Sequence, residues 1–187
     1  MTSQGEWEEE LVAEWLSLKG FFVETNVGLT APKAGGRHEA DIVAVRVDKN
    51  RLLIRHIEVG ILDSSLEENL TTVKGKYRPD LRNAVEEFVK ERVTINGGSE
   101  RVYRCEYVYT YASRKNDLRE QLQKEDIELV SLDSIIVDQI PQTIAEWRKK
   151  QIDSGLLRGK DPTRVQLPRK YRLLEALDRM AELTRGR

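Results

Sequence analysis

Apolar residues recur along the chain with two periods, which together predict an alternation of helices and strands. Within 6–19, helical spacing and a terminating Gly20 predict a first helix whose apolar positions are Trp7, Leu11, Val12, Trp15, Leu16 and Leu18. Runs rich in β-branched and aromatic residues predict strands at 21–27, 39–47, 51–61, 102–112 and 127–131. Further helices are expected at 64–77, 79–92, 114–125, 142–153 and 169–184.

The order of these elements predicts the fold class. The strands at 39–47 and 51–61 are joined by only 48–50, so we expect an antiparallel hairpin. Helix, three strands, helices, strand, helix and strand follow one another, which predicts an α/β fold with a mixed central sheet flanked by helices. We expect a core over 1–137 and a basic helical C-terminal extension over 138–187.

Charge divides the chain in the same place. The formal net charge is −1, but 1–137 hold 19 Lys and Arg against 25 Asp and Glu, whereas 138–187 hold 12 against 7. A basic extension favours a polyanion partner, although exposed helices also carry charge for solubility alone.

Nothing in the sequence indicates a membrane partner. No run approaches the ~20 apolar residues of a membrane-spanning helix. The first ten residues are polar and acidic, unlike a secretory signal, so we expect a cytoplasmic protein.

Two acids on the predicted hairpin are the main chemical feature. Strand alternation places Glu58 on one face with an apolar row and with His56, and it places Asp41 in phase with Val43 on the partner strand. Neighbouring carboxylates at the end of a hairpin form an oxygen-rich site of the kind that Mg²⁺ or Mn²⁺ prefers.

The first helix offers a third acid. Glu8 projects from the centre of its apolar arc, and Glu9, on the flank beside Leu16, is the alternative. Acids in a first turn also stabilise the positive end of the helix dipole without further function.

These features resemble the PD-(D/E)XK nuclease superfamily, most closely its restriction-endonuclease-like and Holliday-junction-resolvase-like branches. The resemblance covers 5–131 and depends on the order of elements and on Gly5, Trp7, Glu8, Gly20, Asp41 and Glu58. It implies a divalent metal bound by Asp41 and Glu58, with the Val59 carbonyl as a further ligand and Glu8 as the helix acid. It also implies a lysine that orients the attacking water.

That lysine is absent from its usual place. Gly60 stands two residues after Glu58, where the superfamily has Lys, and Ala40 precedes Asp41 where the motif has Pro. Lys74, at the edge of the apolar stripe of 64–77, is positioned to reach the site, whereas Lys76 points further outward. Both lysines equally suit a solvated face. His56 either replaces the missing base or packs in the core.

Several basic residues are candidates for phosphate contacts, with ordinary surface charge as the alternative. They are Arg37 and His38 in the Gly-rich loop and, in the extension, Arg148, Lys149, Lys150, Arg164, Arg169, Lys170 and Arg172. Trp147, Tyr171 and the leucine stripe from Leu173 to Leu177 either dock on the body or pair with a second subunit as a homodimer.

The function expected first is metal-dependent hydrolysis of phosphodiester bonds in DNA, with Mg²⁺ or Mn²⁺ as cofactor. Gly60 favours a second hypothesis, a catalytically inactive nuclease fold that binds DNA or assembles with other proteins. A third is an interaction protein that acts through its helical extension.

Overall fold

The computed structural model describes residues 6–29, 38–93, 100–155, 161 and 165–185, and it is built around one five-stranded sheet. The strands are β1 (Phe22–Leu29), β2 (His38–Asp48), β3 (Arg51–Leu62), β4 (Glu100–Ala112) and β5 (Ile127–Ser131). They lie in chain order; β1, β2 and β3 are antiparallel, and β4 and β5 run parallel to β3. The mixed sheet and the hairpin expected from the sequence are thus confirmed.

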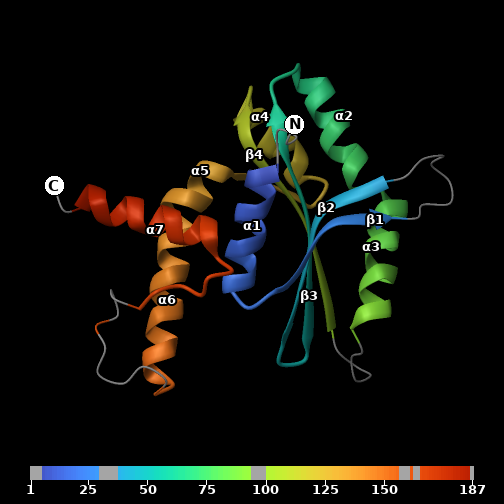
Figure 1. The fold of residues 1–187 in the computed structure, drawn as a ribbon. Helices are drawn as coiled ribbons and strands as arrows, with labels where there is room; N and C mark the ends of the chain where they lie inside the picture. The colour runs from blue at the N-terminus through green and yellow to red at the C-terminus, as the bar shows by residue number, and fades with distance from the viewer. Residues whose placement is uncertain (1–5, 30–37, 94–99, 156–160, 162–164, 186–187) are drawn as a thin grey trace.

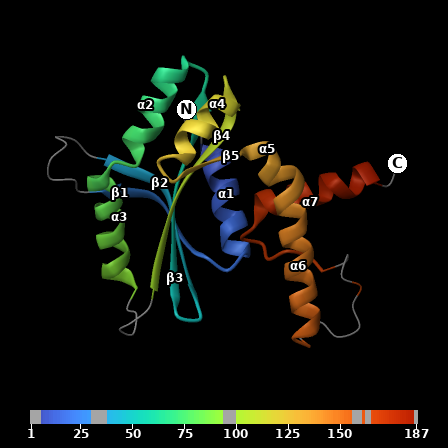
Figure 2. The ribbon, with the colours of Figure 1, turned by 180° about the vertical axis from the view of Figure 1, so that it is seen from behind.

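Helices cover both faces of the sheet, which confirms the α/β class (Figure 1). One side carries α1 (Glu6–Leu18), α5 (Leu132–Ser134), α6 (Ile140–Asp153) and α7 (Arg172–Arg185). The other side carries α2 (Leu66–Lys76) and α3 (Pro79–Arg92), and α4 (Lys115–Gln123) packs in the same core cluster as α2; Figure 2 shows both layers from behind. Among the described residues, no helix has the length and apolarity needed to cross a membrane.

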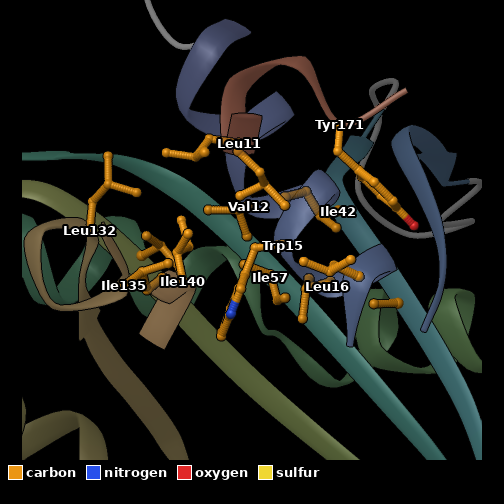
Figure 3. Close-up of a cluster of buried hydrophobic side chains, with 14 of the residues drawn as sticks. Leu11, Val12, Trp15, Leu16, Ile42, Ile57, Leu132, Ile135, Ile140 and Tyr171 are labelled. Carbon is orange, nitrogen blue, oxygen red and sulfur yellow. The ribbon is translucent and has the colours of Figure 1, made fainter. Parts of the chain in front are cut away.

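The largest core cluster joins the C-terminal extension to the body. It centres on Trp15 and Leu16 of α1, which pack on Ile42 and Ile57 of the sheet (Figure 3). The extension contributes Leu167, Tyr171 and Leu174, all buried, and Trp147, Leu173 and Leu177 pack against them. The stripe of the extension therefore docks on the body of its own chain.

The expected boundary at residue 137 lies inside a continuous helical stretch. A π-helical turn, η1 (Ile135–Gln139), connects α5 to α6, and the Ile140 N–H donates to the Ile135 carbonyl. Pro141 follows at once; it has no N–H and its ring crowds the carbonyl of Val137, which a wider turn relieves.

Candidate functional site

Asp41 and Glu58 lie where β2 and β3 separate. The ladder between these strands ends at the pair Ile42 and Ile57; before it, β2 pairs only with β1, and beyond it, β3 pairs only with β4. Val59 lies beyond the last β2–β3 pair, and its N–H donates to Asp41 Oδ2 at 2.8 Å. This hydrogen bond ties the Asp41 carboxylate to the strand that carries Glu58.

The Glu58 side chain is 1% exposed, and both of its oxygens face polar groups. Its Oε1 lies 3.0 Å from His56 Nε2, and its Oε2 lies 2.5 Å from Lys76 Nζ. His56 Nδ1 in turn lies 3.0 Å from Tyr103 Oη. Because a carboxylate only accepts, His56 donates from Nε2 to Glu58, and its Nδ1 forms the hydrogen bond with the Tyr103 hydroxyl. His56 is 1% exposed, so it holds Glu58 in place and does not reach a solvent nucleophile.

The amine at the site is Lys76 and not Lys74. Lys74 Nζ lies 2.9 Å from Glu125 Oε1 on the surface, away from Glu58. The rotation of α2 explains the difference, since its buried face runs through Asn69, Val73 and Tyr77. Lys76 lies seven residues after Asn69, on that same face.

Asn69 is the signal that sequence analysis missed. A polar residue on a helix usually faces solvent, but the Asn69 Nδ2 donates to the Leu62 and Ser64 carbonyls and contacts Ser113 Oγ. A Ser65–Glu68 capping box begins the helix directly before it. The buried amide therefore turns α2 so that Lys76 points at the sheet.

The helix acid on which the charges of the pair act is Glu9, the alternative named from the sequence. Burial raises the pKa of Glu9 to about 7, and the charges of Asp41 and Glu58 are the next largest causes. Burial and the charge of Glu58 likewise raise the pKa of Asp41 to about 6, against the lowering effect of the Val59 N–H and Lys76. Glu8 lies beside Glu9, and its Oε2 is buried without a hydrogen-bond partner among the described residues.

The donor set suits a divalent cation, although it is not a preformed ligand cage. In the described part of the chain, no three His, Cys, Asp or Glu side chains are close enough together to form a metal-binding group. Burial, and after it the charges of neighbouring acids, raise the pKa values of Glu9 and Asp41, and Lys76 Nζ lies 2.5 Å from Glu58 Oε2. Carboxylate oxygens in excess of positive charge are the ligands that Mg²⁺ and Mn²⁺ prefer.

A tyrosine stands at the place of the missing lysine. A Cβ atom added to Gly60 would lie 2.6 Å from Tyr107 Oη, closer than real Cβ contacts allow. Tyr107 belongs to β4 and pairs with Glu58. Sequence analysis did not identify it, because nothing in the local pattern shows which strand lies beside β3.

The predicted phosphate contacts are placed as follows. Lys149, Lys150, Arg169 and Lys170 are exposed. Lys170 lies with Glu9 on the wall of a cleft of about 410 Å³ between α1, β1 and the extension. Arg172 is exposed at the start of α7, and His38 is half-buried at the start of β2. Arg37 and Arg164 are outside the described residues.

Arg148 has a structural role. Its guanidinium binds both oxygens of Asp178, with Nη2 at 2.5 Å from Oδ2, and its Nε donates to the Val165 carbonyl. These contacts connect α6 to α7 within the extension, so this side chain is not free for phosphate.

Comparisons with known proteins add no function. No protein-family model matches the chain, and no curated protein matches it. A solved structure titled "Crystal Structure of Protein of Unknown Function AF1548" is similar with a TM-score of 0.40 and 13% identity, over 97% of this chain and 98% of that one. A similarity at this level supports no argument about the site.

Proposed function

We propose that this protein is a metal-dependent nuclease that hydrolyses phosphodiester bonds in DNA. The observation that supports this most is the convergence of Asp41, Glu58 and Lys76 where β2 and β3 separate. The PD-(D/E)XK resemblance implies two acids and an amine at such a place. Here the amine comes from α2, because Gly60 carries no side chain.

Asp41 and Glu58 would hold the cation, Mg²⁺ or Mn²⁺, and the charge of Glu9 acts on both. When bound, the cation supplies positive charge for the scissile phosphate and makes the attacking water more acidic. Hydrogen bonds between Tyr103 and His56 and between His56 and Glu58 fix the orientation of the Glu58 carboxylate.

Lys76 acts on the substrate in this proposal. Its side chain is 41% exposed, so the amine reaches outward from Glu58 to a phosphate or to the attacking water. An ammonium group there orients the water and offsets the charge that develops on the phosphate. The exposed Lys170, on the same cleft as Glu9, binds the DNA backbone farther from the reaction.

The second candidate is a nuclease fold without activity that binds DNA. Gly60 and the ion pair between Lys76 and Glu58 favour it, because that pair occupies both the amine and a ligand oxygen. Salt-sensitive DNA binding without a metal requirement is its expected property.

The deciding experiment incubates the full chain with duplex, single-stranded, flapped and branched DNA, in Mg²⁺, in Mn²⁺ and in EDTA. We expect metal-dependent cleavage of at least one form. Asp41→Asn and Glu58→Gln, which keep side-chain shape, should lower the rate about 100-fold or more. Binding of DNA without cleavage of any form in either metal would select the inactive alternative.

A further inference from the structure

Tyr107 is a largely buried residue, 5% exposed, whose hydroxyl group is directed at Gly60 of the candidate site. Cys105 and Tyr109, two residues before and after it on the same face of β4, share its core cluster, so the ring is fixed by packing.

The position of this hydroxyl is set by Gly60. Tyr107 pairs with Glu58 across the parallel ladder, and its ring leans over the strand so that Oη lies above Gly60. Burial raises the pKa of this phenol, and the charges of Lys76, Glu58 and Asp41 also act on it.

We infer that the Tyr107 hydroxyl is a substrate-binding group that donates a hydrogen bond to a phosphoryl oxygen of the nucleic acid at the Asp41–Glu58 site. The inference rests on the proposed nuclease function and extends it. The two tasks of a strand-borne lysine are divided here, since Lys76 supplies the charge and Tyr107 supplies a donor at the base of the site.

The chemistry of the phenol agrees with a donor. Burial raises the pKa of Tyr107 to about 12, so the hydroxyl keeps its proton at neutral pH. A phosphoryl oxygen accepts hydrogen bonds and carries negative charge, which makes the bond a strong one. The same geometry explains Gly60, because any side chain there would displace the hydroxyl.

The test compares Tyr107→Phe with Tyr109→Phe. Both tyrosines are buried on one face of β4, at 5% and 6% exposure, so the second variant controls for removal of a buried hydroxyl. Two quantities are measured on the full chain: the affinity for a DNA duplex in EDTA, and the single-turnover cleavage rate in Mn²⁺. We expect Y107F to lower the affinity or the rate about tenfold, as for loss of a hydrogen bond to a charged group, and Y109F to change neither.

A double-variant cycle tests the placement over Gly60. Gly60→Ala alone should reproduce the effect of Y107F, because the new methyl group displaces the tyrosine. In the Y107F background the hydroxyl is gone, and the nearest remaining ring atom, Cζ, lies 3.6 Å from the added Cβ. G60A should therefore cause no further decrease there.

Each outcome is decisive for Tyr107. Equal affinity and rate for Y107F and the unchanged protein would overturn the inference. It would also be overturned if the decrease in the double variant equalled the sum of the decreases in G60A and Y107F. If the unchanged protein binds DNA but does not cut it, the affinity comparison still decides on Tyr107 while the hydrolysis proposal fails. If it neither binds nor cuts, both proposals fail.

Discussion

At the scale of a residue, two lysines on α2 that are two positions apart have different partners and different surroundings. Lys74 lies in a surface ion pair with Glu125, whereas Lys76 lies against a Glu58 side chain that is almost fully buried. Exposed pairs contribute little, about 0 to 1 kcal/mol. In the pair with Glu58, the Lys76 ammonium group compensates the negative charge of a carboxylate that is buried near Asp41.

If the proposed function is correct, Lys76→Ala should lower the cleavage rate about 100-fold, because it removes the amine that the proposal places beside the scissile phosphate. Lys74→Ala is the matched control, two residues away on the same helix, and should keep the full rate. Single-turnover kinetics in Mn²⁺ measure both. Equal rates for the two variants would remove Lys76 from the mechanism.

The raised pKa values of Glu9 and Asp41 predict how stability varies with pH. An acid whose pKa is higher in the folded protein stabilises it fully below the unfolded pKa, near 4, and this stabilisation is lost as pH rises through about 6 to 7. Glu9→Gln should raise the thermal midpoint at pH 7.5 by about 3 °C and change it little at pH 4. Glu10→Gln, at an exposed position, should change neither. Thermal unfolding at both pH values measures this, and an E9Q gain at pH 4 as large as that at pH 7.5 would contradict the assignment.

The same crowding predicts a metal effect that does not depend on catalysis. Mn²⁺ should raise the thermal midpoint at pH 7.5, because a cation bound to the folded state relieves the repulsion between the acids. The rise should be smaller at pH 5, where protons compete for the carboxylates. Asp41→Asn should reduce the rise, and an undiminished rise in that variant would place Mn²⁺ elsewhere.

Among the site residues, those on strands were accessible from sequence and those on helices were less so. Alternation along β3 brings Glu58 and His56 to one face, as the pattern of 51–61 indicates. The rotation of α2 depends on the buried amide of Asn69, which hydropathy assigns to solvent. Tyr107 needs the β3–β4 register, a long-range contact that no local pattern contains.

At the scale of the elements, a hydrogen-bonded contact attaches the start of α7 to α1. Glu14 of α1 is 8% exposed, and its Oε2 accepts the Leu173 and Leu174 N–H groups at 3.0 Å each. A carboxylate at this end of a helix satisfies donors that have no partner within the helix and complements its dipole. One side chain from the first helix thus caps the last one.

Glu14→Ala should lower the free energy of unfolding by about 1 to 2 kcal/mol, the usual cost of losing a helix cap. Glu14→Gln keeps one accepting oxygen and should cost less. Glu10→Ala, on the exposed side of α1, is the control. Urea denaturation measures all three, and a decrease for E10A equal to that for E14A would show that the cap is not the cause.

The types of the elements were predictable because apolar residues recur with clear helical and strand periods in this chain. Several element boundaries were not predictable. The helix expected at 142–153 begins at Ile140, since the π-helical turn before Pro141 continues the preceding helical stretch. The helix expected at 169–184 begins at Arg172, where Glu14 provides its cap. Both differences come from contacts or geometry that apolar spacing does not encode.

At the scale of the whole molecule, an acidic body carries a basic extension on one side of the sheet (Figure 1). If the protein binds DNA as proposed, the acids of the site repel the phosphates and the basic extension attracts them. Arg169 and Lys170 are exposed directly before α7, and Lys170 shares the cleft with Glu9.

The salt dependence of DNA binding should reflect this arrangement. Replacing Arg169 and Lys170 by alanine should reduce the slope of log affinity against log salt by about 2, since each phosphate that the protein neutralises contributes about 0.9. Lys124→Ala, an exposed lysine directly after α4, should leave the slope unchanged. Fluorescence anisotropy across a salt series measures it, and equal slopes for all variants would move the DNA to another face.

The position of an amine on a helix depends on different backbone contacts from the position of an amine on a strand. At position 60 the ladder with β4 fixes the backbone, but Lys76 ends a helix that is anchored at its other end by a capping box and one amide. A partner that shifts α2 by part of a turn would withdraw the amine and leave the acids untouched. In the proposed nuclease, a surface distant from the reacting atoms would thus control activity.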